Sequence, residues 1–211
     1  MKVCEIFLSI QGESSYAGLP CVFVRMAGCN LRCVYCDTSY AYEEGREMTE
    51  DNVFQKVLSY GTGMAEITGG EPLLQRDSLS LVTRLLDSGL TVLIETNGSV
   101  SISGVDPRGI IIMDIKTPGS GMSGTLKIEN LKLLKPHDEL KFVIAGKPDY
   151  DWSKDFIRRH DLTGICTILM SPVFGVNSPA DLAGWILDDR LGVRVNLQLH
   201  KWIYGPEARG V

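Results

Sequence analysis

Short apolar segments alternate with amphipathic segments along this chain, and that alternation is the feature that most constrains its fold. The runs "CVFVRMA" at 21–27 and "MAEIT" at 64–68 predict strands. Between them, "TEDNVFQKVLSY" at 49–60 starts with a threonine typical of a helix N-cap and predicts a helix. Repeated strand–helix–strand units favour parallel strands joined by right-handed crossovers.

The same pattern continues toward the end of the sequence. Further strands are predicted at 90–98, 139–146, 165–172 and 193–200, and helices at 76–89, 151–160 and 179–189. The segment "GIIIMDIKTPGSG" at 109–121 predicts a buried strand followed by a glycine-rich loop. These strands are nearly continuous apolar runs, as expected where helices cover a parallel sheet. An open doubly wound sheet and a full or partial barrel both fit the pattern.

Polar clusters come directly after five of the predicted strands. Because the carboxyl ends of parallel strands carry the site in barrels and in open α/β sheets, these clusters predict one active mouth. The five clusters read "CN", "TGGEP", "ETNG", "DIKTPGSG" and "SPVFG".

Composition excludes several classes of function. The 211 residues suffice for a single α/β domain, expected to span 1–211. A net charge of -5 without a basic run argues against a nucleic-acid binder, and no apolar stretch approaches the 18 residues of a membrane span. The first residues do not read as a signal peptide, so the six cysteines favour a reducing, cytoplasmic setting.

Three cysteines lie within eight positions, as Cys29, Cys33 and Cys36 in "CNLRCVYC". Buried thiols without metal are one interpretation, and a structural zinc site with a distant fourth ligand is another. The third is a [4Fe–4S] cluster, normally held by four thiolates, with one iron left open for an external ligand. Cys4, Cys21 and Cys166 lie among apolar strand residues and are expected in the core, and the only histidines are His137, His160 and His200.

With "ITGGEP" at 67–72, the cysteine motif resembles the radical S-adenosylmethionine superfamily. The resemblance implies a [4Fe–4S] cluster whose open iron binds S-adenosylmethionine, which is then cleaved to a 5′-deoxyadenosyl radical. Glycines at the "GG" pair suit a close approach of the backbone to a ligand. The implied S-adenosylmethionine contacts are Tyr35, Asp37, Gly69, Gly70, Glu71, Lys116, Ser120 and Ser171.

Three further stretches resemble the 7-carboxy-7-deazaguanine synthases: "SIQGES" at 9–14, "FVRMAGCNLRCVYCDTSYA" at 23–41 and "LQLHKWIYGP" at 197–206. The resemblance covers essentially the whole chain and implies a partial, trimmed parallel β/α barrel of about six strands. It implies a carbon–nitrogen lyase that contracts 6-carboxy-5,6,7,8-tetrahydropterin to 7-carboxy-7-deazaguanine with loss of ammonia, on the route to queuosine in tRNA. Magnesium, a flavodoxin or ferredoxin-type reductant and a homodimer are also implied.

Several residues offer the groups that such a substrate needs. Gln11 and Glu13 can read the donor–acceptor edge of a pterin, and Arg25 can pair bidentately with its carboxylate. Thr38, two residues after the last cysteine, is an oxygen ligand for Mg²⁺, which prefers oxygen and keeps waters. The predicted substrate contacts are Ile10, Gln11, Gly12, Glu13, Arg25, Thr68 and His200, the last from the strand expected at 193–200.

Simpler interpretations exist for four of these residues. Arg25 could form an ordinary ion pair, Thr38 could cap a helix, Glu13 could be a surface acid and His200 could be structural.

Two other functions also fit parts of the sequence. One is a glycyl-radical-enzyme activase with a protein substrate, and the other is a zinc-stabilised interaction domain.

Overall fold

The computed structural model describes residues 1–211 and is built on one nine-stranded sheet. The strands are β1 Lys2–Ile10, β2 Pro20–Met26, β3 Arg46–Glu47, β4 Met64–Gly69, β5 Thr91–Thr96, β6 Ile110–Ile115, β7 Glu139–Ile144, β8 Thr167–Pro172 and β9 Arg194–Val195. Their order across the sheet is β3-β1-β2-β4-β5-β6-β7-β8-β9. From β2 to β9 every neighbouring pair is parallel, whereas β1 runs antiparallel to both β2 and β3. Six long parallel strands in a sheet that does not close confirm the expected partial barrel.

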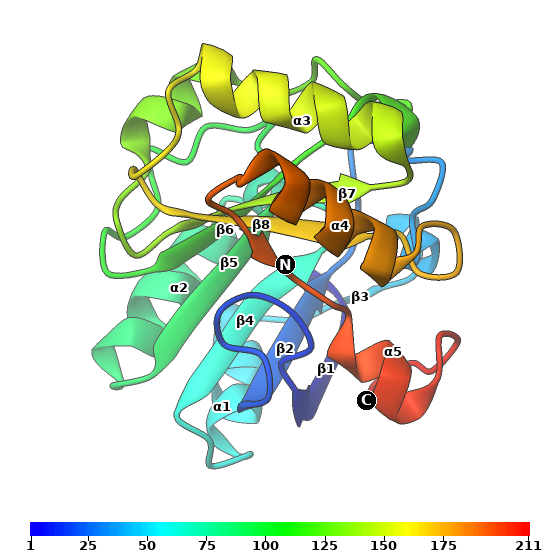
Figure 1. The fold of residues 1–211 in the computed structure, drawn as a ribbon. Coiled ribbons are helices and arrows are strands. Elements are labelled where there is room, and N and C mark those ends of the chain that lie inside the picture. Colours follow the sequence, from blue (N-terminus) through cyan, green and yellow to red (C-terminus); the bar gives the residue numbers. More distant parts are fainter.

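Five α-helices accompany the sheet: α1 Glu50–Leu58, α2 Asp77–Asp87, α3 Lys147–Arg159, α4 Pro179–Asp189 and α5 Leu199–Tyr204. Figure 1 shows α1 to α4 arranged around the outside of the curved sheet, and α5 beside β1. As predicted, the hydroxyl oxygen of Thr49 caps α1 by accepting a hydrogen bond from the Asn52 amide, and Val53 and Val57 are buried. None of the helices is both long enough and apolar enough to cross a bilayer.

The two sides of the sheet bury different kinds of side chain. A cluster of 30 buried residues, including Val24, Ile67 and Ile94, forms the main core. The other side holds a smaller cluster of six: Cys21, Phe23, Met64, Leu93, Ile110 and Ile112. Since side chains alternate along a strand, positions two or four residues beyond those of the small cluster lie on the same face, nearer the carboxyl ends. Those positions carry polar and charged side chains, so the inner face changes from apolar to ionisable along the strands.

Three parts of the fold differ from the sequence-based expectation. The strand predicted at 193–200 is wrong: only Arg194 and Val195 pair with β8, and the chain then enters α5. Both paired residues are exposed, so the alternating segment "VRVNLQLH" buries no apolar face that would hold it in the sheet.

Strand β1 was not predicted, although its residues pair with β2 along almost their whole length. Helix α3 begins at Lys147, four residues earlier than expected, because Pro148 is tolerated in a first turn.

Candidate active site

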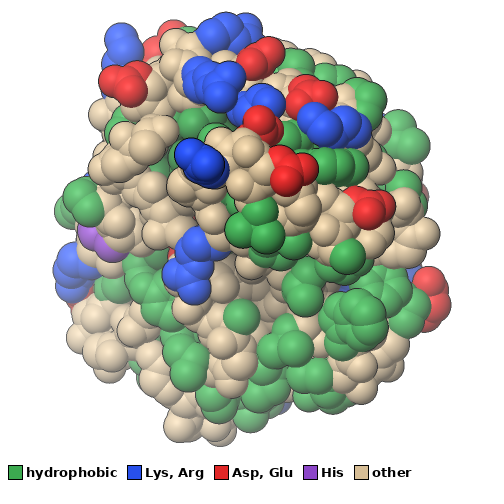
Figure 2. Space-filling model, viewed as in Figure 1, with side chains coloured by type: hydrophobic (Ala, Val, Ile, Leu, Met, Phe, Trp, Pro, Cys, Tyr) green, Lys and Arg blue, Asp and Glu red, His purple; other side chains and the backbone are tan.

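One cavity of about 660 Å³ lies at the carboxyl ends of the parallel strands. All five polar loops that follow the predicted strands contribute to it, through residues such as Cys29, Gly69, Asn97, Lys116 and Val173. The last residues of the chain, 206–211, also line it. Figure 2 shows that charged side chains gather over α3 and α4, while the face around α5 is largely apolar. The cavity is therefore the single mouth that the strand-end loops predicted.

The cysteine loop is fixed where it leaves β2. The amide of Gly28 donates to the Ala41 carbonyl at 2.8 Å, and the Gly28 carbonyl accepts from the Glu71 amide at 2.8 Å. A Cβ atom added to Gly70 would lie only 1.9 Å from the Gly28 carbonyl oxygen, so the end of β4 packs directly on the loop. The "GG" pair thus allows two backbone segments to meet beside the cysteines.

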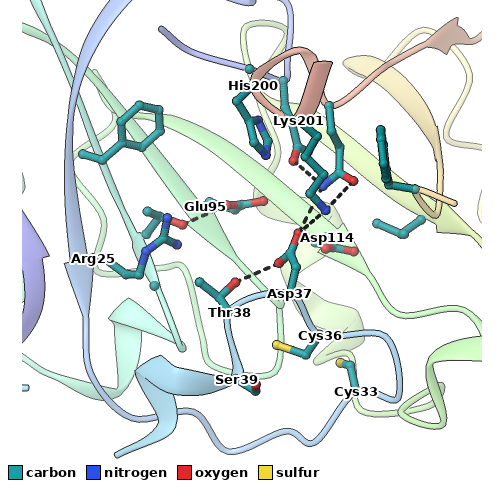
Figure 3. Close-up of a pocket in the computed structure, with 18 of the residues that line it drawn as sticks. Arg25, Cys33, Cys36, Asp37, Thr38, Ser39, Glu95, Asp114, His200 and Lys201 are labelled. Atoms are coloured by element: carbon teal, nitrogen blue, oxygen red, sulfur yellow. Dashed lines mark hydrogen bonds and ion pairs between the residues drawn. The ribbon is translucent and has the colours of Figure 1, made fainter. Parts of the chain in front are cut away.

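The three cysteines of the motif all line the cavity, and all are partly exposed. In Figure 3 the Cys33 and Cys36 side chains lie side by side below Thr38. Burial raises the pKa of the Cys33 thiol, and the nearby Lys116 ammonium opposes that rise. No three cysteine, histidine or acidic side chains gather closely enough in this structure to hold one metal ion. The three thiols are nonetheless accessible from one cavity, as ligands of an iron–sulfur cluster must be.

Thr38 does not act as a helix cap. It precedes the short 3-10 helix Ser39–Tyr42, but its side chain makes no capping bond. Its hydroxyl instead donates to Asp37 Oδ1 at 2.9 Å, and Asp37 Oδ2 accepts from Lys201 Nζ at 2.6 Å (Figure 3). The Thr38 oxygen lone pairs therefore remain available on the cavity wall, as a metal ligand requires.

Gln11 and Glu13 are both held inside the cavity. Gln11 is 3% exposed; its Oε1 accepts from the Glu13 amide at 3.0 Å, and its Nε2 donates to Glu66 Oε2. The Glu13 carboxylate accepts from Gln198 Nε2 at 3.0 Å and from Lys141 Nζ at 2.9 Å. Glu13 is therefore not a surface acid, and the amide of Gln11 has a fixed orientation.

His200 lies against the "QGE" turn. A Cβ atom on Gly12 would lie 2.0 Å from His200 Nδ1, and the Leu199 amide donates to the Gly12 carbonyl at 2.8 Å. His200 lines the cavity, as expected, but from the first turn of α5 instead of a strand. Burial lowers the pKa of its imidazole.

Arg25 forms an ion pair and also faces the cavity. Its Nε donates to Glu5 Oε1 at 2.7 Å, so the ion-pair interpretation is correct for that nitrogen. Its two Nη nitrogens make no hydrogen bond within the protein, and the residue lines the cavity. Part of the guanidinium fork thus remains free for an anion (Figure 3).

The other predicted contacts divide into two groups. Ten of the predicted contacts line the cavity, and among them the Thr68 hydroxyl donates to Glu95 Oε2 at 2.8 Å. Those predicted contacts with S-adenosylmethionine or substrate are Ile10, Gln11, Gly12, Tyr35, Asp37, Thr68, Gly69, Gly70, Lys116 and Ser171. The side chains of Glu71 and Ser120 do not line it, because both are fully buried.

The side chains of Glu71 and Ser120 instead form hydrogen bonds with other groups of the protein. The Glu71 carboxylate accepts hydrogen bonds from the amides of Leu73 and Asn97 and from the Thr96 hydroxyl. The Ser120 hydroxyl donates to the Thr117 carbonyl at 2.6 Å. These two residues shape the loops around the cavity, and their side chains are not placed to touch a ligand.

Four charged residues on the strands that line the cavity were missed by the sequence reasoning: Glu66, Glu95, Asp114 and Lys141. Each is a charged residue inside a mostly apolar strand, although β7 carries Glu139 as well as Lys141, and such charges within apolar runs were the available signal. Lys141 Nζ binds Glu13 and Glu95 and lies 3.8 Å from Asp114 Oδ2. Although burial opposes it, Lys141 lowers the pKa of Glu95 to about 2. The cavity floor is therefore a network of charges.

Comparisons with known proteins agree with this fold and site. Residues 23–178 match the family model described as the radical SAM superfamily, which defines the class as radical S-adenosylmethionine enzymes. The chain is 45% identical to a 7-carboxy-7-deazaguanine synthase of Koribacter versatilis over the full length of both, and 49% identical to that of Chlorobaculum tepidum over all of this chain and 97% of the relative. This chain belongs to the 7-carboxy-7-deazaguanine synthase family of that superfamily.

A solved structure confirms the architecture. The crystal structure of QueE from Escherichia coli superimposes with a TM-score of 0.79 over 94% of each chain. The two sequences are only 19% identical, so this likeness establishes the shared fold alone.

Proposed function

We propose that this protein converts 6-carboxy-5,6,7,8-tetrahydropterin to 7-carboxy-7-deazaguanine with loss of ammonia. The observation that carries the proposal is the full-length identity of 45% and 49% to two synthases, combined with a single cavity that gathers the expected groups. The cysteine loop and the "QGE" turn lie far apart in the sequence, yet both line that cavity. Neither an activase nor a zinc-stabilised module requires this combination.

The cavity offers matched groups for each part of a carboxylated pterin. The buried Gln11 amide, held by Glu13 and Glu66, provides a fixed donor and acceptor for the ring edge. The free Nη nitrogens of Arg25 suit the substrate carboxylate, since a guanidinium pairs bidentately with that group. Gly12 lets His200 pack closely against the turn, because a side chain there would collide with the imidazole.

The same wall fits the cofactors. The thiols of Cys29, Cys33 and Cys36 hold a [4Fe–4S] cluster, and the absence of a fourth cysteine in the loop leaves room for S-adenosylmethionine. When bound, these groups supply a 5′-deoxyadenosyl radical for hydrogen abstraction. Tyr35 is held in place by its hydroxyl, which bonds Thr117 Oγ1 at 3.2 Å and the Val143 carbonyl at 3.3 Å. The backbone at Tyr35 is therefore a rigid surface for the adenine.

The proposal also includes a magnesium ion, a protein that supplies the electron, and a homodimeric assembly. Thr38 provides one oxygen for Mg²⁺, and the substrate carboxylate provides another. A flavodoxin or ferredoxin-type protein supplies the electron, and the enzyme works as a homodimer whose product enters queuosine biosynthesis for tRNA. The six cysteines, all free, support a reducing, cytoplasmic setting.

The test is a reconstitution under anaerobic conditions. The purified protein, loaded with iron and sulfide, is expected to bind about four irons per chain and to form the deazaguanine product from the carboxy-tetrahydropterin. Addition of magnesium should increase turnover. Release of deoxyadenosine without any deazaguanine product would overturn the substrate assignment and favour a protein substrate instead.

A further inference from the structure

Glu66 is the most deeply buried carboxyl of the cavity, and it has no cation of its own. It lies on β4 and is only 4% exposed. Its one hydrogen bond comes from the uncharged amide of Gln11 to Oε2. Its other oxygen, Oε1, makes no hydrogen bond within the protein, although the residue lines the cavity.

The nearby cations are already paired with other acids. Lys141 is bound by Glu13 and Glu95, and the Nε of Arg25 is bound by Glu5. The groups that face Glu66 are thus two carboxylates, one ammonium shared between them, the Gln11 amide and the Cys21 thiol. A charge on Glu66 would be a third buried carboxylate beside one ammonium, and an unpaired buried charge is costly.

A neutral acid satisfies this environment better than a carboxylate. Burial and the neighbouring Glu95 raise the pKa of Glu66 to about 8, in agreement with the geometry. With Oε2 accepting from Gln11, the proton sits on Oε1, the oxygen without a partner in the protein. Oε1 is not among the buried atoms without a partner, so its hydroxyl is accessible from the cavity, where an acceptor on a bound ligand can take its hydrogen bond.

We propose that Glu66 is a substrate-binding residue that acts in its protonated form, donating a hydrogen bond to a carbonyl oxygen or ring nitrogen of the bound pterin. The inference rests on the proposed function for the identity of the substrate. A residue inside strand β4 would thus take part in substrate recognition together with the "QGE" turn. It also gives Glu66 a second task, since the same carboxyl orients the Gln11 amide.

Two substitutions of Glu66 test whether it acts as a hydrogen-bond donor or as a carboxylate. Glu66→Gln keeps an oxygen for Gln11 and an N–H donor for the ligand, so kcat/KM near pH 7 should stay within about threefold of the natural protein. Glu66→Leu removes the donor, and KM should rise by roughly tenfold or more. The control is Glu139→Gln, another buried carboxyl, which lies outside the cavity and binds the Ser15 amide.

The pH profile gives a second readout. In the natural protein kcat/KM should fall as the pH rises through about 8, because the donor proton is lost. In Glu66→Gln this fall should disappear. Equal losses in Glu66→Gln and Glu66→Leu, or a natural enzyme whose kcat/KM rises through that pH, would show that the carboxylate is the active form and overturn the inference.

A third readout needs no turnover. The folded pKa of Glu66 lies above its ordinary value of 4.5, so the contribution of Glu66 to stability is greatest below pH 4.5 and is lost as the pH rises toward 8. The denaturation midpoint of Glu66→Gln, relative to the natural protein, should therefore rise from pH 5 to pH 8. A constant difference would contradict a neutral Glu66. If the natural protein makes no deazaguanine but this difference appears, the proposed function fails while the protonated state of Glu66 stands.

Discussion

Gly70→Ala tests the contact between the end of β4 and the cysteine loop. The added Cβ would lie 1.9 Å from the Gly28 carbonyl oxygen, 2.4 Å from the Gly28 carbonyl carbon and 3.0 Å from the Cys29 Cβ. Two of these three atoms belong to the backbone, so no rotation of a side chain relieves the collision. The loop must move away from β4 by an ångström or more, on the order of the overlap itself.

The size of the effect follows from what that movement disrupts. Overpacking in a rigid interior costs about 1–3 kcal/mol. The hydrogen bond from the Glu71 amide to the Gly28 carbonyl, 2.8 Å long, would be lost or stretched at a further cost of about 1 kcal/mol. The free energy of unfolding should therefore fall by about 2–4 kcal/mol, and displaced Cys29 should reduce iron binding.

The assay is denaturant unfolding of the metal-free protein, together with iron content after reconstitution. Gly63→Ala is the matched control because a Cβ there meets no atom within 4 Å, and it should change stability by no more than about 0.5 kcal/mol. A Gly70→Ala protein with control-like stability and a full complement of iron would refute the close approach of these two segments.

Three other substitutions test separate parts of the site. Cys33→Ala should abolish the cluster and all deoxyadenosine release, and a variant that kept its iron would remove the argument for three thiolate ligands. Thr38→Ala should leave iron content unchanged but weaken the response of turnover to magnesium; an unaltered response would assign the metal to other ligands. Lys141→Met should lower stability by about 3–5 kcal/mol because Glu13 and Glu95 lose their shared ammonium. Adding Glu95→Gln should restore part of that loss, and no recovery at all would argue against the charge network.

The fold was largely predictable because most of its elements carry a local signal. The six long parallel strands are apolar runs, and helices such as Glu50–Leu58 show both a cap and a buried face. The edges of the sheet were not predictable in this way. Strand β1 depends on pairing with β2, and the segment 193–200 alternates like a strand although only two of its residues find a partner.

The candidate site was predictable where residues cluster in the sequence and not where they gather only in space. The cysteine loop and the "QGE" turn are local motifs, and both line the cavity. Glu66 and Lys141 are single charges inside apolar strands, and their significance appears only when the strands are neighbours. The internal hydrogen bonds of the Glu71 carboxylate were not predictable for the same reason, since they come from Thr96 and Asn97 at the end of strand β5.

The two edge strands of the open sheet have a consequence for solubility. An unpaired edge can template the strands of another molecule, and a long, apolar edge is a site of aggregation. Here β3 consists of Arg46 and Glu47 and β9 of Arg194 and Val195, and all four residues are exposed. Edge strands this short and charged are poor templates themselves, although they cover only two residues each of β1 and β8. Substitutions that lengthen β9, or replace Arg194 with a β-branched residue, would remove this protection.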